Sequence, residues 1–106
     1  MPKYLLQVSY TADGTKGVLK DGGSKRRAAA SALVESLGGK IDCFYFAFGE
    51  TDVVAIVDMP DGASAAAASL TVGASGAATS RLTVLLTPEE IDQATRKSAM
   101  YTPPGR

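Results

Sequence analysis

Histidine and tryptophan are absent from this chain, and cysteine occurs once, at Cys43. Without histidine, one chain cannot hold a Ser-His-Asp or Cys-His catalytic arrangement, and the commonest general base is missing. A zinc site would have to be built from one thiolate and carboxylates. We therefore expect no metal and no cofactor. The single cysteine also excludes a disulfide within the chain and fits a reducing compartment.

Neither sign of charge is in excess, because 11 Lys and Arg balance 11 Asp and Glu among the 106 residues. Electrostatic binding to nucleic acid or to an anionic membrane usually needs a basic surplus. We expect neither partner. The sequence also has no apolar run long enough to span a bilayer and no recognisable leader or lipidation motif. These absences lead us to expect a cytoplasmic protein.

Four strand-like segments alternate with helical patterns in the order β-α-β-β-α-β, and a last helix follows. The strands, rich in β-branched and aromatic residues, are expected at Tyr4–Tyr10, Ile41–Phe48, Asp52–Asp58 and Thr79–Leu86. The helices, marked by capping residues and apolar spacing, are expected at Ser24–Leu37, Asp61–Val72 and Thr87–Ser98. This order predicts an α+β, ferredoxin-like fold with a four-stranded antiparallel sheet and two helices on one face.

Glycines mark the breaks between these elements. The glycine-rich segment Thr11–Gly23 predicts a loop with one short helical turn around Lys16–Leu19. Gly38 ends the first long helix with a positive φ. Gly49 is expected to supply the same conformation in a tight turn between the second and third strands. Residues 3–98 then form one domain, and residues 99–106 form a tail.

Alternation along the strands sorts the side chains onto two faces. The more apolar face, expected to meet the helices, carries Leu6, Val8, Phe44, Phe46, Phe48, Val54, Ile56, Leu82, Val84 and Leu86. The small face of the second long helix, expected against the sheet, carries Ala63, Ala66, Ala67 and Leu70. The mixed face carries Leu5, Gln7, Ser9, Cys43, Tyr45, Ala47, Val53, Ala55, Val57, Arg81, Thr83 and Leu85. Its apolar residues predict that a second copy covers it, giving a homodimer or a higher oligomer.

The mixed face also holds the candidate ligand-binding residues, which are polar or aromatic: Gln7, Ser9, Tyr45, Arg81 and Thr83. An arginine on a half-covered sheet needs a partner, because an unpaired buried charge is costly. That partner is either the carboxylate or phosphate of a small anionic ligand, or one of Asp42, Glu50 and Asp52. The residues alone leave both alternatives open.

Other features favour structural roles. The cations Lys25–Arg27 are expected at a solvated helix end, although an anion bound there would relieve their opposition to the helix dipole. Cys43 is expected to pack as a small apolar residue. Gly49 and Asp52 are expected to serve the turn. The aromatic run Phe44–Phe48 is not preceded by the Lys/Arg-Gly pair that opens the signature of an RNA-recognition motif, so RNA binding is not expected.

Four short segments together resemble the GYD domain, a small bacterial family with no established activity. They are Gly38-Gly39-Lys40 before Phe44-Tyr45, Phe48-Gly49-Glu50-Thr51-Asp52, Met59-Pro60-Asp61, and Ala74-Ser75-Gly76. The family resembles dimeric α/β barrels of ferredoxin-like fold, so the resemblance implies a homodimer. The marker residues of the motif are Gly49, Thr51 and Asp52. Thr51 stands where the family usually has its namesake tyrosine.

Two functions remain open. The first is a homo-oligomeric domain that binds a small molecule or serves only in assembly. The alternative is a cofactor-independent dimeric-barrel enzyme, of oxygenase or cyclase type, in which Tyr45 and Arg81 orient an acidic or phenolic substrate. Without histidine, that enzyme needs a tyrosine or carboxylate with a shifted pKa. Convergence of Tyr45 and Arg81 in one cavity would favour the enzyme.

Overall fold

The computed structural model describes all 106 residues. Its strands are β1 (Lys3–Tyr10), β2 (Lys40–Phe46), β3 (Val53–Asp58) and β4 (Ala78–Leu85). Its helices are α1 (Ala12–Asp21), α2 (Gly23–Ser36), α3 (Gly62–Ala74) and α4 (Pro88–Thr95). The sequence thus predicted every strand and three of the four helices.

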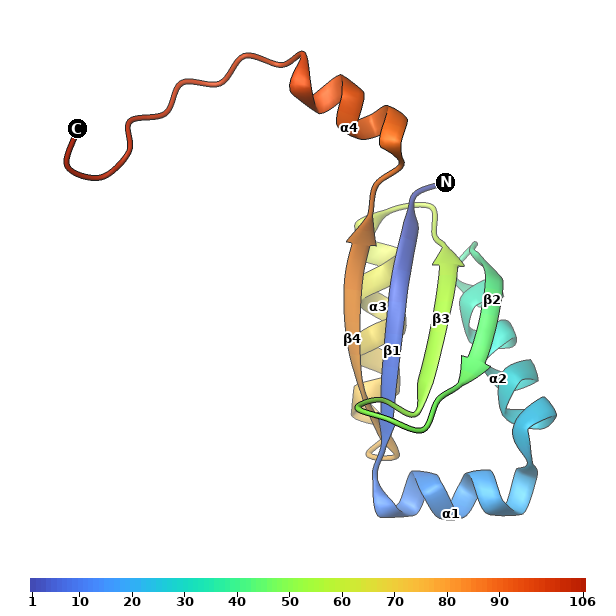
Figure 1. The fold of residues 1–106 in the computed structure, drawn as a ribbon. Coiled ribbons are helices and arrows are strands. Elements are labelled where there is room, and N and C mark those ends of the chain that lie inside the picture. Colours follow the sequence, from blue (N-terminus) through green and yellow to red (C-terminus); the bar gives the residue numbers. More distant parts are fainter.

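The strands form one four-stranded sheet in the order β2-β3-β1-β4, and all neighbouring pairs are antiparallel. Figure 1 shows α2 and α3 on the same side of this sheet, while α1 crosses its end and α4 stands away from it. The predicted α+β class with an antiparallel sheet and two helices on one face is confirmed. The opposite face, which we call the open face, is covered by no helix.

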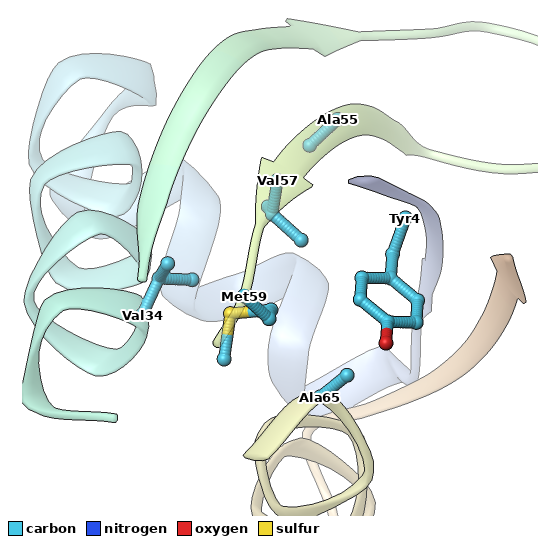
Figure 2. Packing of buried hydrophobic residues seen from close by; sticks show 6 residues of the cluster. All are labelled: Tyr4, Val34, Ala55, Val57, Met59 and Ala65. Carbon is cyan, nitrogen blue, oxygen red and sulfur yellow. The ribbon is translucent and has the colours of Figure 1, made fainter. Parts of the chain in front are cut away.

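The main core lies between the sheet and the two covering helices. Figure 2 shows Val34 of α2 and Ala65 of α3 on either side of Met59, with Tyr4 and Val57 above them from the sheet. Met59 is completely buried. Burial of apolar surface of this kind stabilises the fold by roughly 25 cal/mol per Å². The core therefore fixes both helices against the same face of the sheet.

The prediction for the two faces of β3 was wrong. Val53, Ala55 and Val57 are buried under the helices, not placed on the open face. Both parities of this strand are apolar, so alternation could not decide between them. The register decides, because directly paired residues share a face. Val53 pairs with Val8, and Val57 with Tyr4; Val54 and Ile56 consequently lie on the open face.

Four aromatic and aliphatic side chains expected under the helices are more exposed than predicted: Phe46, Phe48, Val84 and Leu86. Phe48 is fully exposed, because β2 ends at Phe46 and residues 47–52 form a loop instead of a tight turn. Gly49 in this loop does not have a positive φ, so that expectation was also wrong. An irregularity between Ile41 and Cys43 lets both Ile41 and Phe44 pack on the core.

The expected loop at residues 11–23 is mostly helix α1. Thr11 caps it by accepting a hydrogen bond from the Gly14 amide at 3.2 Å. Gly14 is buried, and an added Cβ there would lie 2.0 Å from the carbonyl oxygen of Ala77. Glycine is therefore required at position 14 because the backbone of Ala77 lies close to it, and it does not mark a break between elements. Gly22, with φ of 79°, separates α1 from α2.

Helix ends and faces differ in detail from the predictions. Ser24 does not cap α2, which begins after Gly22 without a side-chain cap. Gly38 has the expected positive φ after α2. Helix α3 turns Ala65 and Ala68 to the sheet and leaves Leu70 73% exposed. The predicted contact face of α3 was therefore wrong by about one position at each turn, since alanine on every side gave no amphipathic pattern.

The last helix has the predicted capping box. Thr87 and Glu90 exchange side chain to backbone hydrogen bonds of 3.1 Å in both directions. The helix ends at Thr95, earlier than the expected Ser98, and all of its residues are exposed. None of the four helices combines the length and the apolar character that a membrane span requires.

Candidate functional site

One row of residues crosses the open face from edge to edge. The pairing register aligns Tyr45 with Val54, Val54 with Gln7, and Gln7 with Arg81. Tyr45 lies on edge strand β2 and Arg81 on the opposite edge strand β4. Three strand spacings separate them, which is about 14 Å at the usual spacing. The predicted pair thus shares a face and a row but does not converge within one chain.

A polar pocket of about 480 Å³ lies at one end of this face, and we call it the loop pocket. It is lined by Gln7, Ser9, Glu50, Thr51, Thr79, Ser80 and Arg81. In Figure 1 the loop between β2 and β3 passes across the ends of β1 and β4, and Glu50 and Thr51 of this loop line the pocket. Three predicted ligand-binding residues, Gln7, Ser9 and Arg81, therefore meet in one pocket.

Tyr45 and Thr83 lie outside the loop pocket. Tyr45 is 68% exposed on its edge strand. Thr83 is exposed one row away, where it pairs with Leu5. Sequence reasoning missed Thr79 and Ser80 as lining residues, and it named Glu50 only as a possible carboxylate partner of Arg81. Thr79 could have been found from alternation, because it shares the parity of Arg81, whereas Glu50 reaches the pocket only through the path of its loop.

Arg81 has no ion pair within the chain. Of the three carboxylates proposed as its partners, Asp42 pairs with Lys3. Asp52 accepts a hydrogen bond from the backbone N–H of Tyr10 at 2.7 Å. Glu50 lines the same pocket but forms no salt bridge with Arg81. The guanidinium therefore keeps donors free, and such groups suit bidentate binding of a carboxylate or phosphate.

The motif residues have separate roles around this pocket. Asp52 fixes the loop, since its backbone N–H also donates to Val8 at 2.8 Å and its carbonyl accepts from Ala47 at 2.8 Å. Thr51, at the position of the missing family tyrosine, lines the pocket. Gly49 meets no neighbouring atom where a Cβ would stand. Asp52 was expected to bond N–H groups of the turn, but its side chain bonds β1 and its backbone closes the loop.

The remaining part of the open face is apolar. Between the loop pocket and the opposite end of the sheet, half-buried side chains come from all four strands: Leu5, Cys43, Val54, Ile56 and Leu85. Ile56 pairs with both Cys43 and Leu5, whereas Val54 and Leu85 lie in the neighbouring rows on either side. Cys43 is free and half-buried among them. We call these five residues the apolar patch.

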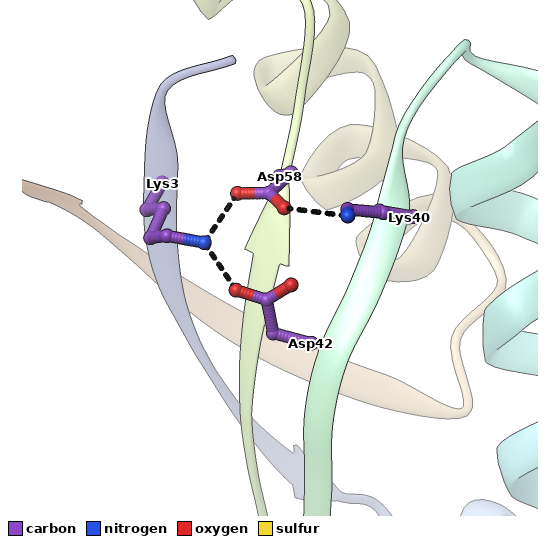
Figure 3. A network of polar contacts seen from close by, with 4 residues as sticks. All are labelled: Lys3, Lys40, Asp42 and Asp58. Carbon is purple, nitrogen blue, oxygen red and sulfur yellow. Dashed lines mark hydrogen bonds and ion pairs between the residues drawn. The ribbon is translucent and has the colours of Figure 1, made fainter.

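Charged residues missed by sequence reasoning close the far end of the face. Figure 3 shows the ammonium group of Lys3 between Asp42 and Asp58, with Lys40 on the other side of Asp58. The Nζ atom of Lys3 lies 2.8 Å from one carboxylate oxygen of Asp58, and the Nζ atom of Lys40 lies 3.8 Å from the other. Alternation alone would put Lys40 and Asp42 on the same face as Phe44. The irregularity between Ile41 and Cys43, together with the register, brings Lys3 and Lys40 opposite Asp58.

The pKa values follow these contacts. Hydrogen bonds to Asp42 and then to Asp58 raise the pKa of Lys3 to about 12. The hydrogen bond from Lys3 in turn lowers the pKa of Asp58, which is only 5% exposed. The network contains two lysines and two aspartates, so their charges balance one another. They form a structural network and not a site with a free donor or base.

The basic residues at the start of α2 have a partner within the chain. Lys25 and Arg26 at the start of α2 lie 3.7 and 3.6 Å from the two carboxylate oxygens of Asp21. The positive charge in the first turn of the helix is therefore partly offset.

No group of three or more histidine, cysteine, aspartate or glutamate residues is placed to hold a metal ion.

Comparison with known proteins gives one match. No curated protein and no solved structure matches the chain. The family model described as the GYD domain matches residues 4–95, which includes the loop pocket and all four strands except the first residue of β1. This match covers most of the 106 residues, so the chain belongs to the GYD domain family.

Proposed function

We propose that the chain is a non-enzymatic homodimeric domain of the ferredoxin-like, dimeric α/β barrel type. Two copies pack their open faces together, and the loop pocket binds a small anionic molecule. The carrying observation is the apolar patch on a face that no helix covers. Continuous apolar surface of this kind is typical of interfaces between proteins.

The strand order supports this architecture. Apart from the added helices α1 and α4, the chain follows the β-α-β-β-α-β connection of ferredoxin-like domains, and its sheet order is β2-β3-β1-β4. Isologous packing would set the same patch of each copy against the other. The free thiol of Cys43 in this patch fits a reducing compartment such as the cytoplasm.

The pocket chemistry supports an anionic ligand. All seven lining residues are polar or charged, and Arg81 among them has no ion pair. The separation of Tyr45 from Arg81 within the chain favours binding over the enzyme alternative, which required both groups at one substrate.

The dimer is tested by sedimentation velocity at micromolar concentration. We expect a mass of two chains for the wild type and of one chain for Ile56→Lys, because a lysine in the centre of the patch buries an unpaired charge. Leu70→Lys on α3 is the matched control, since Leu70 is 73% exposed on the other side of the sheet. It should remain dimeric. A monomeric wild type, or dissociation by both variants, would overturn the proposal.

The pocket is tested by native mass spectrometry and by titration with inorganic phosphate and succinate, followed through amide chemical shifts. We expect shifts for Gln7, Ser9 and Arg81 with at least one anion. Arg81→Gln should remove them without changing the subunit count. Shifts confined to exposed lysines, or unchanged binding in Arg81→Gln, would show that Arg81 is not the anion partner.

A further inference from the structure

A second cavity lies on the opposite side of the sheet from the loop pocket. It occupies about 320 Å³ between α2, α3 and the strands, and we call it the inter-helix cavity. Fifteen of its eighteen lining residues are hydrophobic. Its volume stands at the lower end of the range for small-molecule pockets, roughly 300 to 1,000 Å³. It shares no lining residue with the loop pocket.

The sequence of α3 keeps this cavity unfilled. Helix α3 directs Ala68 and Val72 to the cavity and turns its larger Leu70 to solvent. Six alanines line the cavity, from both helices, from the sheet and from the turn before β4: Ala29, Ala30, Ala55, Ala68, Ala77 and Ala78. Protein interiors normally close such gaps to the density of organic crystals. The small side chains instead leave room for an apolar occupant.

Arg26 is the one charged residue of the lining. Its side chain is 38% exposed, and Asp21 lies 3.6 Å away, beyond the distance of a good charged hydrogen bond. The guanidinium has five N–H donors, so it can bind a further carboxylate. The hydroxyls of Thr71 and Ser75 already donate to the carbonyls of Ala67 and Val72. Arg26 is therefore the charged donor available to a ligand.

We propose that the inter-helix cavity binds a medium-chain aliphatic carboxylate, with the alkyl chain among the alanines and the carboxylate on Arg26. Both halves of the ligand follow from the lining. An apolar chain gains from burial against Ala68, Val72 and Phe44, and a single anionic group matches a single arginine. Because this site lies under the helices, it does not depend on the pairing of the open faces.

Isothermal titration of the full chain with sodium decanoate, below its micelle concentration, tests the site. We expect one decanoate per chain and about tenfold weaker binding for Arg26→Gln, the size expected for loss of a charge-assisted hydrogen bond. Arg27→Gln is the matched control, because Arg27 is the exposed neighbour outside the cavity lining. Decan-1-ol, which lacks the charge, should bind weakly and without difference between Arg26→Gln and the wild type.

The apolar half is tested by filling the cavity. Ala68→Leu should abolish decanoate binding, and Ala30→Leu on the half-buried side of α2 provides a second variant should the first fail to fold. Circular dichroism reports on folding. Absence of decanoate binding to the wild type, many weak sites per chain, or equal affinities for the wild type and Arg26→Gln would each overturn the proposal.

Discussion

The side chain of Asp52 accepts a hydrogen bond from the backbone N–H of Tyr10 at 2.7 Å, although 42 residues separate them in the chain. This contact lies just before β3 begins, where β1 still pairs with β4 but no longer has β3 beside it. The carboxylate takes the place of the next strand residue and satisfies a backbone donor that would otherwise lack a partner. The same residue holds both ends of the loop that covers the loop pocket.

Replacing Asp52 with alanine should therefore loosen the loop and lower the free energy of unfolding by about 1–2 kcal/mol, because one half-buried N–H loses its acceptor. Amide hydrogen exchange should become faster at Tyr10, while urea unfolding gives the free energy. Glu50→Ala, in the same loop but without a hydrogen bond to the sheet, is the control and should unfold like the wild type. An unchanged exchange rate at Tyr10 would refute the anchoring role.

The charged network of Figure 3 predicts a second effect on stability. Asp58→Asn keeps the shape of the buried side chain but loses the charge that Lys3 and Lys40 face. We expect a loss of about 1 kcal/mol, which is below the roughly 1.5–3 kcal/mol of charged hydrogen bonds because water screens the exposed lysines. Asp92→Asn on the exposed α4 controls for net charge. Equal urea midpoints for the two variants would contradict this expectation.

The lowered pKa of Asp58 also sets the acid dependence of stability. An aspartate has a pKa of about 3.9 in an unfolded chain. Since the folded value is lower, the contribution is present above pH 4 and is lost as pH falls through the folded pKa. Lys3, with its pKa raised to about 12, behaves in the opposite sense and loses its contribution only as pH rises toward that value.

Urea unfolding measured from pH 2 to 7 should thus show a fall in stability at the acid end that is smaller in Asp58→Asn than in the wild type. The variant and the wild type should converge at the lowest pH, where neither carries a charge at this position. Parallel curves across the whole range would mean that other carboxylates account for the acid dependence.

The order of elements could be read from the sequence because most of them carry strong local signals. Pro88 and the capping pair of Thr87 and Glu90 predict where α4 begins, although the helix ends at Thr95 and not at Ser98. Strand β3 shows the limit of such signals, since it is apolar on both parities and only pairing with Tyr4 and Val8 decides its buried face. Alternation of polar and apolar side chains identifies the buried face of a strand when the other face is polar. It cannot do so when both faces are apolar.

The candidate site was predictable in composition and not in geometry. Parity correctly gathered Gln7, Ser9 and Arg81, since it needs no knowledge of the strand order. The distance from Tyr45 to Arg81 required that order, which places β2 and β4 at opposite edges. Glu50 and Thr51 reach the loop pocket because of the path of their loop, and this path depends on the contact of Asp52 with β1. That contact is non-local, and no sequence pattern predicted it.

The two glycines of α1 predict opposite effects of the same substitution. Gly14→Ala should lower the free energy of unfolding by about 1–3 kcal/mol, the usual size for overpacking, because the new Cβ would lie 2.0 Å from the Ala77 carbonyl oxygen. Gly17→Ala meets nothing within 4 Å and should raise it by up to about 1 kcal/mol through better helix propensity.

Thermal and urea unfolding of both variants measure this difference, and each variant is the control for the other, because both add one methyl group to the same helix. Opposite shifts show that Gly14 is required by the contact between α1 and the start of β4. If both substitutions stabilised the protein, α1 would have to lie farther from Ala77 than the structure places it, and Thr11 would lose its bond to the same carbonyl.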